Sequence, residues 1–292
     1  MTENLRLAAS YLIKNEVDII EANIRFHAQQ GVDHFAIMDN GSTDGTREVI
    51  ESLRSEFDIF VLDRPEHTYQ FHKWRQEIVG VCDKAFSPDI TICCDADEFW
   101  INKHGKTLKS ALSRNDSVVT VPRYNMIPSK SILDGGDFYD TELKVLNPIS
   151  FNKEAQKNKH ELAILLSKIG PKVAVNPRGL ISLNGGNHRA KHIHFWNGRV
   201  SDDLAVYHYP VRSYEHFERN VLNRKKVIDD KSLNIRIGDH YRRWARIYDA
   251  GRLHDEYMKF FFSVEEAEIL KRVGVLEVDE AAKDALSCIQ VK

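Results

Sequence analysis

Three carboxylates, Asp95, Asp97 and Glu98, follow directly on an apolar run in the stretch CCDADEFW (residues 93–100). Carboxylates this close repel one another, and burying one without a partner costs free energy. Divalent cations such as Mg²⁺ and Mn²⁺ prefer oxygen ligands, and Mg²⁺ commonly takes one or two protein carboxylates together with substrate phosphates. The stretch therefore favours a cation site, with an acidic surface turn as the plainer alternative.

Other metal chemistries fit the sequence less well. An EF-hand loop that starts at Asp95 needs glycine and glutamate at positions where Trp100 and Lys106 stand. His192 and His194 would share one face of a strand, so a zinc pair stays open, but no further ligands at zinc spacing accompany them.

A second polar motif, DNGSTDGT (residues 39–46), follows the apolar run HFAIM. Gly41 and Gly45 permit a tight turn, and Ser42 or Asp44 can cap the helix that follows. As a turn the motif needs no function. An aspartate at a strand end, here Asp39, is also well placed to accept hydrogen bonds from a base or ribose. Because the chain has neither a P-loop nor a GxGxxG turn after its first strand, kinases, ATPases and dinucleotide oxidoreductases are disfavoured.

The elements that position these motifs alternate along the first part of the chain. Apolar runs predict strands at residues 5–13, 34–39, 57–63, 89–95 and 118–121, and helical spacing lies between the first four. This alternation predicts an α/β fold with a doubly wound, mostly parallel sheet flanked by helices. Ligands bind at the carboxyl ends of strands in such sheets, so the two acidic turns should be neighbours.

The rest of the chain is harder to interpret. Residues 126–212 are rich in proline and glycine, and helical spacing returns from Ser213 into a helical tail. Ser263 and Glu266 fit a capping box. We expect one domain over residues 1–292, divided into a strand–helix half (1–125), an irregular region (126–212) and the tail (213–292).

Composition limits the class of protein. The 292 residues carry a formal charge of −2, from 41 basic and 43 acidic side chains, and 42% are hydrophobic, which is typical of a globular chain without a nucleic-acid-binding surface. We see neither a membrane span nor a signal peptide and expect a cytoplasmic protein, with a peripheral contact of the tail at the inner face of the membrane left open. The four cysteines show no CxxC spacing and are expected to be reduced and buried: Cys82, Cys93, Cys94 and Cys288.

Four ordered motifs, KNE (14–16), GVDHFAIMDNGSTDGT (31–46), CDADEFW (94–100) and HYPVRSYEHF (208–217), resemble family-2 glycosyltransferases of the GT-A fold. Within that family the chain is similar to the subgroup with a DNGSTDGT turn and a DADEF metal motif. The resemblance is specific over residues 6–100 and weaker around residues 170–217. It makes residues 1–125 the nucleotide-sugar-binding half and 126–212 the region that binds the acceptor and completes the metal site.

The resemblance also implies roles for particular residues. Asp39 would contact the nucleobase, Asp95 and Asp97 would hold Mn²⁺ or Mg²⁺ and the diphosphate, and His208 would complete the metal shell. A partly buried histidine bonded to backbone is the alternative for His208. Further contacts to the sugar nucleotide are expected from the residues of the first two turns: Asn15, Glu16, Asn40, Ser42 and Asp44.

The implied reaction displaces the diphosphate of a sugar nucleotide by an acceptor hydroxyl on a glycan, a lipid-linked sugar or a protein. Inversion at the anomeric carbon needs a base, for which Asp137 is our candidate, and Glu98 could serve as the base or support the metal. Lys172 could meet phosphate charge, although solvated surface charge is the plainer role. Trp74 and Trp196 are the aromatic residues we would test first for stacking on sugars.

Two other functions stay open at this stage. A nucleotidyltransferase would also place paired carboxylates and metals at strand ends, but its glycine-rich basic loop is missing after the first strand. A non-catalytic module could use the same fold to bind a glycan or a partner.

Overall fold

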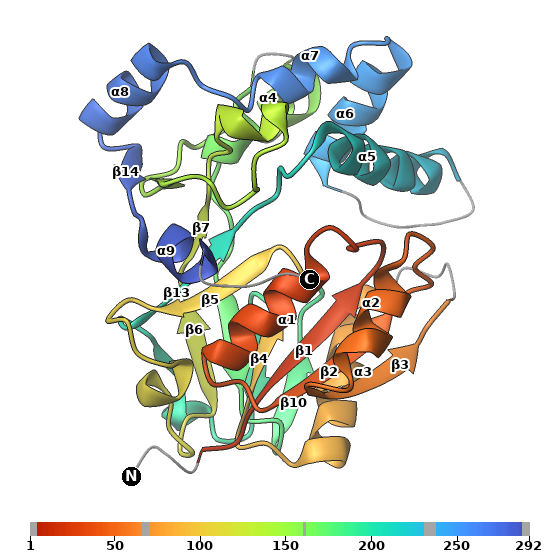
Figure 1. The fold of residues 1–292 in the computed structure, drawn as a ribbon, viewed down its shortest axis with the longest axis vertical. Helices are drawn as coiled ribbons and strands as arrows, with labels where there is room; N and C mark the ends of the chain where they lie inside the picture. Colours follow the sequence, from red (N-terminus) through yellow and green to blue (C-terminus); the bar gives the residue numbers. More distant parts are fainter. Residues whose placement is uncertain (1–4, 66–69, 160–161, 231–237, 288–292) are drawn as a thin grey trace. The chain divides into compact units, whose positions relative to one another are not determined.

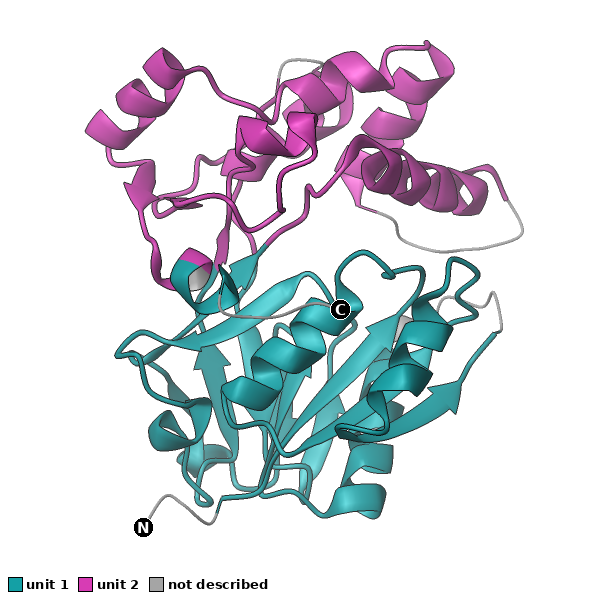
Figure 2. Ribbon diagram, viewed as in Figure 1, with its two compact units in different colours: residues 1–123, 170–208, 284–292 teal, residues 124–169, 209–283 magenta. Residues whose placement is uncertain are grey.

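A computed structural model of the protein describes residues 5–65, 70–159, 162–230 and 238–287. It divides into two compact units (Figure 2): unit 1 comprises Met1–Arg123, Gly170–His208 and Asp284–Lys292, and unit 2 comprises Tyr124–Ile169 and Tyr209–Lys283. This division differs from the single domain with boundaries at 125 and 212 that we expected. The first boundary lies close to the predicted one, but the irregular region is split, because its second part returns to the sheet of unit 1.

Unit 1 is built on a seven-stranded sheet with the order β12-β6-β9-β4-β1-β2-β3 (Figure 1). β9 runs antiparallel to both of its neighbours, whereas the other adjacent strands pair in parallel. The predicted α/β architecture with a mostly parallel sheet is therefore confirmed. The strands are β1 (Leu7–Ile13), β2 (His34–Asp39), β3 (Asp58–Asp63), β4 (Ile90–Cys94), β6 (Val118–Val121), β9 (Lys172–Val175) and β12 (Arg199–Val200).

Helices cover both faces of this sheet. Every residue of β1 is therefore buried, because its side chains alternate between two cores. On one face, α3 (Phe71–Phe86) packs on Ala8 and Leu12 of β1. On the other, Tyr11 donates a hydrogen bond from its hydroxyl to Asn23 of α1 (Ile20–Gln29) at 2.9 Å. α2 (Thr46–Leu53) packs beside α1.

Two pairs of short strands extend unit 1. β5 (Glu98–Asn102) pairs antiparallel with β13 (Leu204–His208), and the hairpin of β10 (Leu180–Leu183) and β11 (Ala190–His192) lies beside α3. None of the four was expected from the sequence. Two 3₁₀ turns complete the unit: η1 (Leu108–Ala111) and η4 (Phe195–Asn197).

Unit 2 is mainly helical and has its own apolar core, which includes Phe217, Tyr257 and Phe260. The predicted capping box is confirmed at the start of α8, where Ser263 and Glu266 each satisfy the other's backbone N–H. Its elements, with those at the unit boundaries, are β7 (Arg123–Asn125), η2 (Lys130–Asp134), β8 (Leu143–Val145), α4 (Lys153–Asn158), η3 (Ile164–Leu166), α5 (Tyr214–Asp229), α6 (Asp239–Asp249), α7 (Leu253–Met258), α8 (Val264–Arg272), β14 (Leu276–Val278) and α9 (Ala281–Ser287).

Three of the predicted buried thiols, Cys82, Cys93 and Cys94, are free and buried, and Cys288 lies outside the described residues. Among the described helices, none has the length and apolar character that crossing a bilayer requires.

Candidate functional site

The two acidic turns of unit 1 lie at one edge of the sheet, as the strand order predicts. Ile13 pairs with Asp39 across β1 and β2, and Tyr11 pairs with Cys94 across β1 and β4. Because these three strands are parallel, the segments after Ile13, Asp39 and Cys94 all leave the sheet at its carboxyl edge. This is the edge at which doubly wound sheets bind ligands.

The turn after β2 is held by its own polar side chains. Asp39 is buried, and its Oδ1 accepts hydrogen bonds from the backbone N–H of Ser42 at 2.9 Å and from the Ser42 hydroxyl at 2.7 Å. Within the described residues both side-chain hydrogen bonds of Asp39 go to Oδ1. Its Oδ2 therefore keeps its capacity to accept a hydrogen bond from another partner. Gly41 has φ 72°, a left-handed conformation that glycine adopts without strain.

The segment after β1 locks onto this turn. Asn15, which has a positive φ of 59°, receives Thr43 N–H on its side-chain oxygen at 2.8 Å and donates its own N–H to the Ser42 hydroxyl at 3.0 Å. Glu16 N–H donates to Thr46 Oγ1 at 2.8 Å, and the backbone N–H of Thr46 donates to the Asp44 carboxylate at 3.1 Å, although the N-cap residue of α2 is Gly45 and not Ser42 or Asp44. The first two turns thus form one hydrogen-bonded loop pair.

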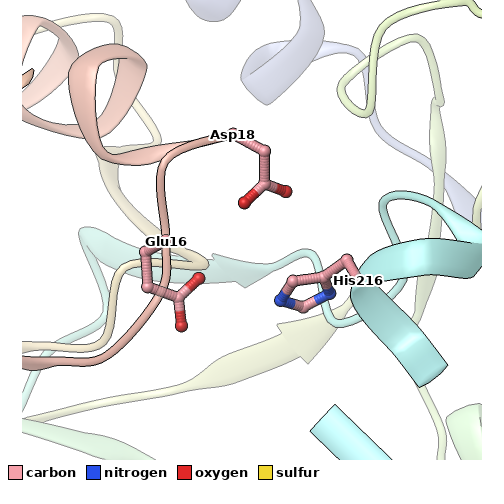
Figure 3. A group of neighbouring side chains, drawn as sticks. All are labelled: Glu16, Asp18 and His216. Atoms are coloured by element: carbon pink, nitrogen blue, oxygen red, sulfur yellow. The ribbon is translucent and has the colours of Figure 1, made fainter. Parts of the chain in front are cut away.

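Figure 3 labels two acidic side chains of unit 1 and one histidine of unit 2. Glu16 and Asp18 lie on the segment that follows β1, in unit 1, and His216 lies on the first turn of α5, in unit 2. Within unit 2, His216 Nε2 lies 2.6 Å from a guanidinium nitrogen of Arg212 and 3.0 Å from the side-chain amide of Asn220. Asn40, which the sequence also placed near the donor, donates its side-chain amide to the Arg64 carbonyl at 2.5 Å.

Asp95 is surrounded by cations of the protein. Arg75 donates to its Oδ1, and Lys172 Nζ lies 2.5 Å from its Oδ2. Desolvation opposes ionisation of this carboxyl, but the charges of Arg75 and Lys172 outweigh it and hold the pKa of Asp95 well below its usual range. Asp95 was expected to bind the metal and diphosphate, yet both of its oxygens already accept hydrogen bonds from cations of the chain.

Glu98 is paired in the same way. It is fully buried, with Arg123 Nη1 2.5 Å from Oε1 and Lys172 Nζ 3.0 Å from Oε2, and that second oxygen also accepts the backbone N–H of Asp95 at 3.2 Å. A fully buried carboxylate that is paired with two cations is not exposed to a substrate hydroxyl. The geometry thus differs from that expected of a catalytic base. Lys172 is also fully buried, so its expected role as solvated surface charge is wrong.

Asp97 lies beside His208, with 3.2 Å between its Oδ2 and the histidine Nε2. The antiparallel pairing of β5 and β13 brings them together, because His208 is in register with Glu98. One ligand atom from each of Asp97, Glu98 and His208 lies within 4.8 Å of the other two. Carboxylates and imidazoles are ligand types that a divalent cation accepts, and Glu98 is already paired with Arg123 and Lys172.

Other predicted residues lie away from this site. Both nitrogens of His192 are engaged, one 3.1 Å from the Arg178 carbonyl and the other accepting the N–H of His194 at 3.0 Å, which argues against the zinc pair. Trp74 is buried under the sheet in the α3 core, so it is not available for stacking, whereas Trp196 is exposed.

Asp137 belongs to unit 2. There it is exposed, and it forms a side-chain hydrogen bond with Tyr139.

The structure also reveals functional residues that the sequence did not single out. Arg75 comes from α3 and Arg123 from the start of β7, and neither is close in sequence to the acidic turn whose charges they balance. The only sequence signal was the uncompensated acidity of that turn. It predicted positive charge near the turn, but did not indicate that arginine and lysine side chains of the chain itself supply most of that charge.

The sequence profile of glycosyl transferase family 2 matches residues 12–162, more than half of the chain. The protein therefore belongs to glycosyl transferase family 2, and it is a glycosyltransferase with the α/β fold of the GT-A class, as the sequence predicted. Among curated protein sequences, none matches the chain significantly.

Solved structures with similar folds have low sequence identity to this chain. The structure of S. aureus TarS 1–349 is 11% identical, with 88% of this chain and 72% of that chain covered and a TM-score of 0.43. The complex of TarS 1–349 with UDP-GlcNAc is 10% identical, with 88% of this chain and 74% of that chain covered and a TM-score of 0.43. Glucosyl-3-phosphoglycerate synthase from Mycobacterium tuberculosis, in complex with phosphoglyceric acid, is 18% identical, with 76% and 77% covered and a TM-score of 0.37. The chain spans 44% of a longer TarS structure.

Proposed function

We propose that the protein transfers a sugar from a nucleoside-diphosphate donor to an acceptor hydroxyl, with inversion at the anomeric carbon and with a requirement for Mn²⁺ or Mg²⁺. Family membership supports glycosyl transfer from a nucleotide sugar. The observation that carries the metal requirement is the cluster of Asp97, Glu98 and His208, whose ligand atoms lie within 4.8 Å of one another in unit 1.

In this proposal Asp97 and His208 hold the cation, and Asp39 binds the nucleobase through Oδ2 while Ser42 fixes its orientation. Arg75 and Lys172 hold Asp95 ionised beside the cation site without using it as a ligand. When bound, the divalent cation would stabilise the negative charge that develops on the departing diphosphate. Asn15, Glu16 and Asp44 would act by shaping the loop pair that receives the donor.

The base that activates the acceptor hydroxyl is proposed to be Asp137. It is exposed, in contrast to the fully buried Glu98, so a substrate hydroxyl can reach it. Replacing Asp137 with asparagine is expected to remove transfer while leaving donor binding unchanged. The anomeric configuration of the product, read by proton NMR, tests inversion independently.

The central test measures thermal unfolding with a panel of nucleoside diphosphates, with and without Mn²⁺. At about 100 times its Kd a ligand stabilises by about 2.7 kcal/mol, which corresponds to a rise in Tm of about 4 °C for a protein of this size. Asp97→Asn should abolish the Mn²⁺-dependent part of the rise. Asp203→Asn is the matched control, because Asp203 forms a carboxylate–histidine pair with His104 at 3.0 Å in the same unit.

Two results would count against the proposal. If no nucleotide raises the Tm, the proposed donor site is refuted. If Asp97→Asn and Asp203→Asn lose the Mn²⁺-dependent rise in Tm equally, the proposed metal role of Asp97 is refuted. The alternatives are separated by turnover: a nucleotidyltransferase releases pyrophosphate from a nucleoside triphosphate, and a binding module shows the Tm shift without consuming sugar nucleotide.

A further inference from the structure

Unit 1 carries a cluster of exposed apolar side chains away from the acidic turns. We call it the apolar edge surface and define it as Ile181, Ile193, Phe195, Trp196 and Val200, each of which is more than half exposed. In the described part of unit 1, Phe60 is the only other large apolar side chain that is exposed. Phe195 and Trp196 contact each other with ring centroids 5.2 Å apart. Exposed apolar clusters of this kind mark interaction sites.

The surface exists because the sheet is covered unevenly. α3 packs on β1 and β2, and the β10–β11 hairpin packs against β4, β9 and Val118 of β6. A hollow lies between the hairpin and the outer strands. Apolar side chains line it, among them Val118, Ile181, Phe195 and Val200, together with Lys191 and Arg199. Nothing among the described residues fills this hollow.

The segment that carries this surface is rich in basic residues, and Asp202 and Asp203 follow directly after it. From residue 170 to residue 201 the chain has five lysines and arginines and no aspartate or glutamate, although the protein as a whole carries a formal charge of −2. Arg178, Arg189 and Lys191 are exposed. Arg199 pairs with Asp116 at 2.8 Å, and Arg178 lies 3.6 Å from Asp89, but among the described residues no carboxylate forms an ion pair with Arg189 or Lys191.

We propose that the apolar edge surface docks unit 1 onto an anionic lipid bilayer. Phe and Trp side chains are suited to the boundary between headgroups and acyl chains, and lysine and arginine beside them meet lipid phosphate while their aliphatic stems cover apolar surface. Anionic headgroups complement an exposed basic segment that lacks acidic residues. Ile181, Ile193 and Val200 add aliphatic area that a sugar ring would not use.

A second copy of the chain fits this surface less well. β12 is the edge strand, but it has only two residues, Arg199 and Val200, which is too short to add a strand from another molecule. The unpaired positive charge of Arg189 and Lys191 would also repel the same charge on a copy related by a two-fold axis.

The helical tail, where a membrane contact was left open by the sequence, offers a direct contrast. Val264 and Ile269 of α8 are as exposed as the apolar edge surface, but Glu265, Glu266 and Glu268 lie between them. Acidic side chains are repelled by an anionic bilayer. Exposure alone therefore does not distinguish the two surfaces, whereas charge does.

The surface lies at the end of the sheet opposite to the candidate site. β6 and β12 run in the same direction as β4, because β9 is antiparallel to both β4 and β6. Phe195 and Trp196 of η4 precede β12 and lie at the amino edge, whereas Asp97 follows β4 at the carboxyl edge. Docking through this surface would leave the carboxyl edge of unit 1 clear of lipid.

The test is co-sedimentation of the full chain with sucrose-loaded vesicles of phosphatidylcholine alone and with about 30% phosphatidylglycerol. We expect binding only to the anionic vesicles, weakened when NaCl is raised to about 0.5 M. Phe195→Ser with Trp196→Ser should lower the partition coefficient at least about tenfold. Lys191→Glu should lower it about 25-fold, since each unit of charge is worth about fivefold. Val264→Ser with Ile269→Ser is the matched control and should bind as the unaltered chain does.

Several outcomes would overturn the proposal. These are no binding to either vesicle, equal loss in the Phe195/Trp196 and Val264/Ile269 variants, and binding that Lys191→Glu leaves unchanged. Sedimentation velocity without lipid adds one more: a dimer that the Phe195/Trp196 variant dissociates would assign the surface to a second copy. All of these variants change exposed side chains, and a Tm unchanged from the parent confirms that they fold.

Discussion

Replacing Lys172 with methionine should destabilise unit 1 strongly, because it removes the cation shared by two carboxylates. Lys172 Nζ is fully buried, 2.5 Å from Asp95 Oδ2 and 3.0 Å from Glu98 Oε2. Methionine keeps most of the volume, so the change isolates the charge. Removing one partner of a buried ion pair costs about 3–5 kcal/mol, because the remaining charge is left in a poorly solvated site. We expect a loss in this range, with Arg75 and Arg123 retaining one carboxylate each.

Urea unfolding at pH 7, followed by far-UV circular dichroism, measures the loss. Lys109→Met is the matched control: its ammonium lies 2.6 Å from Asp33, but the pair is partly exposed and should contribute only about 0–1 kcal/mol. Adding Glu98→Gln to Lys172→Met should lower the stability further, because Arg123 then loses its carboxylate partner. Equal losses for the two lysine variants, or no further loss in the double variant, would refute the electrostatic reasoning.

Two further predictions concern buried titratable groups of unit 1. Burial lowers the pKa of His27 from 6.5 to about 4. Between these two pH values the unfolded chain binds a proton at His27 and the folded chain does not. The free energy of unfolding should therefore fall by about 1.4 kcal/mol per pH unit as the pH drops from about 6.5 toward 4. His27→Gln should remove that part of the slope in urea midpoints, and an unchanged slope would contradict the assignment. Burial also raises the pKa of three thiols, so a Cys288→Ser variant should react with Ellman's reagent at pH 8 only on unfolding; rapid reaction of the folded protein would show the thiols to be accessible. These thiols are Cys82, Cys93 and Cys94.

How far the sequence predicts this molecule depends on the range of the interaction. The strands β1 to β4 and β6 were identified from local apolar runs, because each is a continuous buried segment bounded by turn residues. β5 and β13 were missed: β5 begins inside the acidic motif at Glu98, and both strands acquire meaning only through their pairing with each other, about a hundred residues apart. The burial of Lys172 was missed for the same reason, since β9 enters the sheet from a proline- and glycine-rich region.

The acidic turn shows how this limit affects the prediction of a site. Three adjacent carboxylates required positive charge, and that inference holds, but charge balance does not say where the charge comes from. Arg75, Lys172 and Arg123 neutralise Asp95 and Glu98 with permanent cations of the chain.

Asp97 lies 3.2 Å from His208, whose charge depends on protonation. A neutral imidazole can give its lone pair to a metal, whereas a lysine or arginine cannot. Asp95 and Glu98 are therefore fixed in a salt-bridge network, whereas Asp97 lies beside a side chain that can itself bind a metal, which is why the proposed cation site rests on Asp97 and His208.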